Sequence, residues 1–177
     1  MQINTLIVPV DVMMIYTLDS GETITISSRQ VTSRRALERG NAIAPRQTWE
    51  GEEMIGGIEV MSTEYRAMLD AYFAGVQADI TNHEGNPIFH YDMTLNDYRD
   101  VWALPELADV QYGLLDGGEP YKAGAKFTIR ELILEAVYRA NPRWDPFRSE
   151  ETGESIGGLS SYSGVPETGK PGAKRGK

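Results

Sequence analysis

The sequence predicts a mainly β fold of the α+β class. We expect a small split β-barrel or sandwich of about seven strands, with one amphipathic helix at about residues 62–75 and an extended C-terminal tail. Runs of alternating apolar residues between turn-forming segments indicate the strands, and one apolar stripe with helical spacing indicates the helix. After residue 140, Gly, Ser and Pro become frequent and aliphatic residues rare. We therefore expect a barrel-like domain over residues 1–140 and a tail with a basic end over residues 141–177.

The first two strands are expected to form a hairpin around the loop Asp19–Glu22, whose glycine permits a tight turn. Apolar residues alternate along one side of each run, namely Met14, Tyr16 and Leu18 before the loop and Ile24 and Ile26 after it. The segment that follows leaves two alternatives open. Residues 33–40, "SRRALERG", form either a short helix capped by Ser33 and stopped at Gly40 or an exposed basic loop.

The helix expected at residues 62–75 is supported at both ends as well as along its face. Ser62 is a suitable N-cap because its hydroxyl can accept an unpaired backbone N–H, and Glu64 complements the positive end of the helix. Gly75 is a suitable stop. The spacing favours packing into the core over a cofactor site, and the stripe consists of Tyr65, Met68, Leu69, Tyr72, Phe73 and Val76.

Five further strands complete the expected count. A short apolar run at residues 58–61 gives one, and two more pair around a turn at residues 84–87, the second of them over residues 88–95. Residues 109–115 and 126–138 form the last pair. Along 126–138 the apolar side changes midway, which a β-bulge or burial on both faces would explain.

Composition excludes several classes of function. The chain has 177 residues and no cysteine, which excludes disulfides and zinc sites that use sulfur. The net charge of −9 argues against specific nucleic-acid binding. The longest apolar run is too short to cross a bilayer, and the first residues lack the pattern of a signal peptide. We expect no membrane partner and synthesis in the cytoplasm.

No segment matches a catalytic or cofactor motif. His83 and His90 are the only histidines, and their spacing matches no metal motif. Carboxylates in residues 95–102 and 104–111 could form the acid pair of a hydrolase, although acidic residues are common in loops. We therefore expect a protein that is not an enzyme, without catalytic, cofactor-binding or metal-binding residues, cofactor or small-molecule substrate.

Two groups of residues are interface candidates. The first is an arginine cluster in an otherwise acidic chain, either a solvated face or a patch that docks an acidic neighbour such as another copy: Arg29, Arg34, Arg35 and Arg39. The second follows the expected domain and combines the residue types that anchor interfaces: Arg143, Trp144, Phe147 and Arg148. The alternative for the second group is that it folds back on its own domain.

The order of these elements, from Leu6 to Tyr138, resembles that of the split-barrel proteins of phage tails, which include tube, distal-tail and baseplate-hub proteins. The pattern consists of the hairpin, the helix, the segment "ITNHEGNPIFHYDMTLNDYRDV" and the last strand pair. The resemblance implies a small barrel with a flanking helix, copies that join their sheets into rings, and no catalytic residues. The chain lacks the long apolar hairpin loop of a tube subunit, which favours a baseplate or junction role.

From this resemblance we expect a structural, ring-forming component of a bacteriophage tail, at the baseplate or tube-end junction. Its partners would be copies of itself and neighbouring tail or baseplate proteins. It would be located in the virion tail after synthesis in the host cytoplasm. The alternatives are a head–tail neck protein, either a tail terminator or a stopper, and, from another class, a small β-barrel binding module or a hydrolase that uses loop carboxylates.

Overall fold

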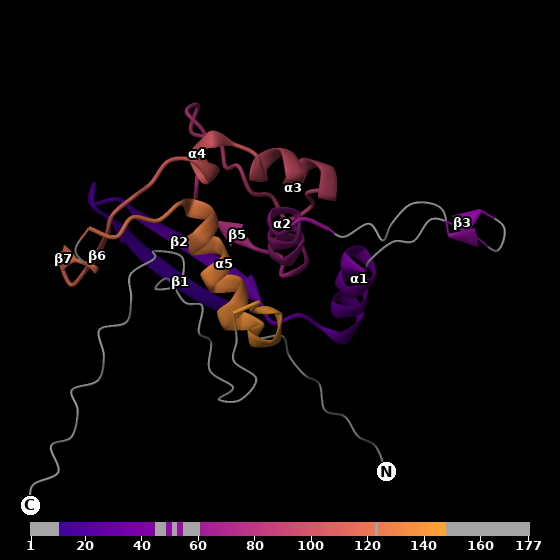
Figure 1. Cartoon of the computed structure of the whole chain (residues 1–177). Helices are drawn as coiled ribbons and strands as arrows, with labels where there is room; N and C mark the ends of the chain where they lie inside the picture. The colour runs from indigo at the N-terminus through magenta and orange to yellow at the C-terminus, as the bar shows by residue number, and fades with distance from the viewer. Residues whose placement is uncertain (1–10, 45–48, 51–52, 55–60, 123, 148–177) are drawn as a thin grey trace, which may run out of the picture.

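The computed structural model describes residues 11–44, 49–50, 53–54, 61–122 and 124–147. They form an α+β fold in which helices pack on one face of an open antiparallel sheet (Figure 1). The main sheet has five strands, in the order β5-β2-β1-β6-β7, and is not a closed barrel. The α+β class is confirmed, whereas the split β-barrel or sandwich of about seven strands is wrong, because the main sheet is a single open one with five strands.

The main sheet is built on the predicted hairpin, which is confirmed. Its first two strands pair along their whole length, from Asp11 opposite Arg29 to Thr17 opposite Thr23. The other three strands are only two or three residues long. The strand bounds are β1 Asp11–Leu18, β2 Thr23–Arg29, β5 Gln77–Ala78, β6 Leu114–Asp116 and β7 Glu119–Pro120. A separate pair consists of β3 Trp49–Glu50 and β4 Glu53–Met54.

Five α-helices and one 3-10 helix lie within the described residues, where the sequence predicted one dependable helix. Their bounds are α1 Ser33–Ile43, α2 Thr63–Phe73, α3 Leu95–Trp102, α4 Pro105–Ala108, α5 Ile129–Ala140 and the 3-10 helix η1 Pro142–Trp144. None of the helices in the described part of the chain is long and apolar enough to cross a membrane.

The predicted helix at residues 62–75 is confirmed as α2. The Ser62 hydroxyl accepts the backbone N–H of Tyr65 at 3.3 Å, as expected of an N-cap. The helix ends just before Gly75, whose φ of +60° suits a residue without a side chain. The sequence left two alternatives for residues 33–40, a helix or a basic loop, and the helix is the correct one. This helix, α1, has Thr32 as its N-cap residue and continues past Gly40.

The predicted strand at residues 126–138 is wrong, because most of this segment is α5. Thr128 and Glu131 form a capping box at its start, in which each side chain bonds the other's backbone N–H. The apparent change of apolar side reflects helical spacing, since the buried residues include Ile129, Leu132, Ile133, Ala136, Val137 and Ala140. This helix packs against β1 and β2 and forms the centre of the core.

The predicted strand at residues 88–95 is also wrong. Phe89 is buried against Tyr98, while Tyr91 is 84 % exposed in an irregular segment. Thr94 then caps α3 with Asp97 in a second capping box. Alternating hydrophobicity in this segment therefore comes from one anchoring aromatic residue and a helix start. The strand predicted at residues 58–61 falls almost entirely outside the described residues.

The packed part of the chain continues past residue 140, where the sequence suggested a boundary. The Asn141 side chain is buried, accepts the Val31 N–H at 2.8 Å and donates to the Arg29 carbonyl at 2.9 Å. These bonds tie the end of α5 to the segment between β2 and α1. Residues 148–177, most of the expected tail, lie outside the described residues.

Candidate functional site: the open edge of the sheet

One edge of β1 lacks a partner strand along most of its length. The Leu18 N–H donates to the Glu22 carbonyl at 2.8 Å, so the backbone groups of Leu18 point towards β2. Because this direction alternates along an antiparallel strand, Met13 and Ile15 direct their N–H and C=O groups to the opposite edge. On that edge β6 pairs only with Thr17 and Leu18. The stretch Asp11–Ile15 is called here the β1 edge. On its side away from β2, no described strand pairs with it.

The β1 edge is open because β6 turns away after three residues. A two-residue loop, Gly117–Gly118, joins β6 to β7, and both glycines have positive φ angles of +60° and +89°. Such a loop gives the tight turn that reverses a strand in a hairpin. The glycine pair therefore ends β6 level with Thr17, and no other described strand pairs with this edge of β1 beyond it.

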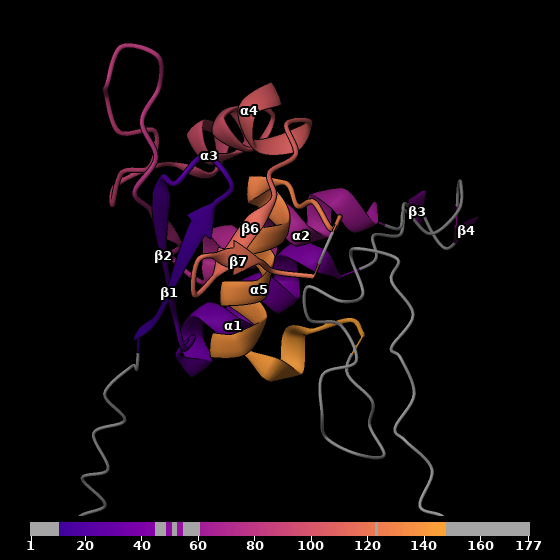
Figure 2. The ribbon, with the colours of Figure 1, turned by 90° about the vertical axis from the view of Figure 1, so that its left-hand side faces the viewer.

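Two apolar side chains of the β1 edge are exposed. Met13 and Ile15 are each 66 % exposed, on the face of the sheet opposite α5. In Figure 2 the described helices lie to one side of the β1–β2 hairpin. Residues 12–16 contain neither a charged residue nor a proline, the features that commonly protect an exposed strand edge.

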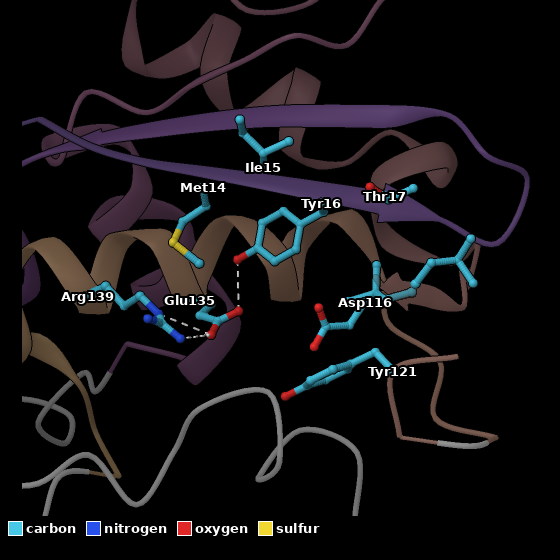
Figure 3. A pocket seen from close by; sticks show the side chains of 10 residues that line it. Met14, Ile15, Tyr16, Thr17, Asp116, Tyr121, Glu135 and Arg139 are labelled. Atoms are coloured by element: carbon cyan, nitrogen blue, oxygen red, sulfur yellow. Dashed lines mark hydrogen bonds and ion pairs between the residues drawn. The ribbon is translucent and has the colours of Figure 1, made fainter. Parts of the chain in front are cut away.

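A pocket of about 200 Å³ opens beside the same edge, on the α5 side of the sheet (Figure 3). Met14 and Tyr16 of β1 form its roof, and Tyr121 closes the opposite side. Two residues of α5, Glu135 and Arg139, line one side of the pocket, between this roof and Tyr121. A strand laid along the β1 edge would therefore have room for an inward-pointing side chain.

Three of the polar side chains that line this pocket bond one another. The Tyr16 hydroxyl donates to Glu135 Oε2 at 2.8 Å, and Arg139 Nη2 pairs with Glu135 Oε1 at 2.9 Å. Burial, together with the neighbouring Glu135 carboxylate, raises the pKa of Tyr16 well above its usual value, so the hydroxyl stays protonated. Both oxygens of the Glu135 carboxylate therefore have partners, while Asp116 and Tyr121 add further polar groups to the lining, so the pocket combines apolar and polar walls.

The four arginines of the first interface group do not form one surface patch. Arg29 pairs with Asp11 at 3.6 Å across the hairpin, and Arg34 pairs with Glu38 at 3.1 Å along α1. Arg35 lies with its guanidinium 5.9 Å from the centre of the Tyr72 ring. Arg39 differs from the other three because its side chain is only 9 % exposed.

Arg39 is held inside the domain by a buried cluster. Its Nε donates to Asp70 Oδ1 at 2.6 Å, and its guanidinium lies 4.3 Å from the centre of the Trp144 ring. The Tyr138 hydroxyl donates to the other Asp70 oxygen at 3.3 Å. The Asp70 side chain is 1 % exposed. The Arg39 charge is therefore neutralised internally, and this residue holds α1, α2 and η1 together.

The second interface group is divided in the same way. Trp144 folds back onto Arg39, the alternative that the sequence left open. Arg143 is exposed and, with Trp144, lines an open pocket of about 570 Å³ at the end of α5. Phe147 is 45 % exposed, and its backbone N–H donates to Asp145. Arg148 lies outside the described residues.

The residues weighed for chemistry do not converge. His83 is exposed and lies 3.8 Å from Glu84, and His90 is exposed in the segment before α3. The carboxylate of Asp97 bonds the Thr94 hydroxyl and backbone, which lowers its pKa and gives it a capping role. No group of three potential metal-ligating side chains gathers within the described ranges.

Sequence reasoning missed Asp70, Glu135 and Arg139. The spacing of Glu135 and Arg139 is that of an i,i+4 ion pair, which is visible only once the segment is assigned to a helix. Asp70 interrupts the apolar stripe of α2, and a carboxylate at such a position indicates a buried cationic partner.

Comparison of the chain with family models, with curated proteins and with solved structures gave no match.

Proposed function

We propose that the chain is a structural, ring-forming component of a phage tail, at the baseplate or tube-end junction, whose copies join along the β1 edge. The observation that carries the assembly is the coincidence of three features at one place. Met13 and Ile15 present unpaired backbone groups, exposed apolar side chains and an adjoining pocket. An open strand edge of this kind is a template for pairing with another chain.

Charge distribution supports a head-to-tail contact rather than a symmetric one. Helix α1, which carries Arg34 and Arg35 in addition to the buried Arg39, lies near one end of the β1–β2 hairpin, close to where β2 ends. The hairpin loop and the β6–β7 loop lie at the other end (Figure 1), and both carry exposed acidic residues: Asp19, Glu22, Asp116 and Glu119. A contact between unlike ends closes a ring when its rotation permits.

The place in a phage tail rests on the resemblance, through the hairpin and α2. The two later strand pairs no longer support it, because their second members are helical or irregular. In the virion the partners would be further copies and neighbouring tail or baseplate proteins. A neck protein, either a tail terminator or a stopper, is the second candidate, since an open edge and unlike charged ends would serve a neck ring equally well.

Sedimentation and electron microscopy of the purified full-length chain test this proposal. The wild-type chain should form rings of defined mass, and Met13→Lys with Ile15→Lys should remain monomeric, because two charges would lie on the joining edge. The control, Tyr91→Lys with Val110→Lys, adds the same charge at two other exposed apolar residues and should still form rings. A wild-type chain that stays monomeric at high concentration, and also when an already assembled ring of a neighbouring tail protein is added, would contradict the proposal.

A further inference from the structure

We propose that the β1 edge binds a strand of a neighbouring subunit that carries an arginine, whose side chain enters the adjoining pocket of about 200 Å³ and meets Asp116. This inference rests on the proposed assembly and adds the chemistry by which the joining edge recognises its partner. An extended segment added to a sheet edge gains affinity from main-chain hydrogen bonds, and pockets that receive its alternate side chains give specificity. The lining of this pocket therefore indicates which strand fits.

The register of β6 places the pocket in the row that an added strand would occupy. β6 pairs its Leu115 with Thr17, so the next residue, Asp116, comes level with Tyr16. Residues level with each other in adjacent strands point to the same face, and Tyr16 points to α5 because its hydroxyl bonds Glu135. After Asp116 the chain turns away from β1, so an added strand would continue the row that β6 begins.

The partner residue level with Met14 would direct its side chain into the pocket. Met14 lies two residues from Tyr16 and points to the same face, where it lines the pocket. The partner residue would therefore lie two positions beyond Asp116 in the row, or about 7 Å away. A long side chain can interact over such a distance.

The charges that line the pocket favour a cation. Glu135 is matched by Arg139, whose Nε and Nη2 donate to its Oε1 at 3.2 and 2.9 Å. Asp116 directs its carboxylate into the pocket, towards Glu135 (Figure 3). Within the described residues, Asp116 has no ion pair or side-chain hydrogen bond. One negative charge in the lining is therefore unbalanced, and a basic side chain would neutralise it.

The β6–β7 hairpin adds to this negative charge. Asp116 lies directly opposite Glu119, and like charges in this position are destabilising. The nearest basic residue along the chain, Lys122, lies instead over the Tyr121 ring, 5.5 Å from its centre. A partner's cation beside Asp116 would relieve the repulsion between the two acids.

The apolar walls suit the stem of the same side chain. Met14 and the rings of Tyr16 and Tyr121 line the pocket together with Asp116. Lysine and arginine lay their methylene stems along apolar surface while the charged end reaches a polar group. A cavity of about 150 Å³ holds a benzene molecule, so this pocket has room for such a stem. Arginine fits better than lysine, because its planar guanidinium can bond both oxygens of one carboxylate and stack on an aromatic ring.

Peptide titration followed by NMR tests this inference on the full-length chain, kept below the concentration at which rings form. The probe is the acetylated and amidated pentapeptide Thr-Val-Arg-Val-Thr. With its arginine level with Met14, its valines would lie beside Met13 and Ile15. Two matched probes carry norleucine or glutamate in place of arginine. The arginine peptide should shift the amide signals of Met13 and Ile15 and bind at least about tenfold more tightly than the norleucine peptide, with the glutamate peptide weakest.

Asp116→Asn tests the role of the carboxylate. This variant should lose the preference for arginine over norleucine. Its stability in urea should be unchanged or higher, because the repulsion with Glu119 is removed. Asp92→Asn, which changes an exposed acid outside the pocket, is the control and should keep the full preference. Equal affinities of the wild type for the arginine and norleucine peptides, or a preference that survives in Asp116→Asn, would overturn the inference.

Ring formation separates this inference from the proposed function. If the wild-type chain forms rings but no peptide shifts the amides of Met13 and Ile15, the inference fails and the assembly stands. If the wild-type chain forms no rings, the proposed assembly fails, even when the arginine peptide binds as expected.

Discussion

The Arg39–Asp70 pair provides the sharpest test of how the helices are held together. In Asp70→Ala the guanidinium of Arg39 stays buried under Trp144 without its carboxylate. Breaking a buried ion pair on one side costs about 3–5 kcal/mol, because a charge remains in the interior without a partner. At about 2–4 °C per kcal/mol for a chain of this length, the melting temperature should fall by roughly 6–20 °C.

The double variant Arg39→Met with Asp70→Leu is the matched control. It removes both charges and keeps apolar volume at the site, so its cost should be small. Arg39 Nη2 is buried and has no hydrogen-bond partner among the described residues, which lowers the cost of removing the guanidinium further. Urea unfolding followed by circular dichroism measures both variants. The reasoning is refuted if Asp70→Ala costs less than about 1 kcal/mol, or if the double variant costs as much as the single one.

Three further predictions concern single groups of residues. Arg34→Glu with Arg35→Glu should leave the monomer folded at a modest cost in stability, because Arg34 is exposed and Arg35 is half-buried beside the Tyr72 ring. The same variant should block ring formation as seen by sedimentation; normal rings would count against the head-to-tail contact. Burial and Glu135 raise the pKa of Tyr16, so the folded state keeps this proton longer than the unfolded state, whose pKa is near 10. The stabilisation is complete below pH 10 and declines above it, so Tyr16→Phe should make the fall in unfolding free energy from pH 10 to 11 shallower; an unchanged slope in urea titrations would refute this. His83→Gln with His90→Gln should change neither stability nor assembly, because both side chains are exposed, and metal analysis that finds an equimolar transition metal lost in this variant would contradict it.

Local sequence signals predicted the hairpin and α2 because each carries its own evidence. The hairpin combines alternating residues with a Gly-containing loop, and α2 combines a stripe with a cap at Ser62. α5 was missed because eight of its twelve residues are buried, so apolar residues run almost continuously through it and its helical spacing is hard to distinguish from a buried strand. The "TIRE" sequence at Thr128 was the local sign of a helix start that outweighs the β-branched composition.

The site was less accessible to sequence reasoning than the fold. The glycine pair Gly117–Gly118 signals a turn, but only the three-dimensional pairing shows that this turn leaves β1 uncovered. Arg39 was grouped with Arg34 and Arg35 by proximity along the chain. Its separation from them follows from helix geometry, since it lies on the face of α1 that meets Asp70 of α2.

Amide hydrogen exchange at single residues tests the central claim, that copies join along the β1 edge, most directly. Assembled and dissociated samples of the full-length chain are labelled in D₂O, quenched and compared residue by residue. The amides of Met13 and Ile15 should exchange at least tenfold more slowly in the assembly, whereas those of Met14 and Tyr16, already bonded to β2, should change little by comparison. Equal exchange of Met13 and Ile15 in the two samples would contradict the account.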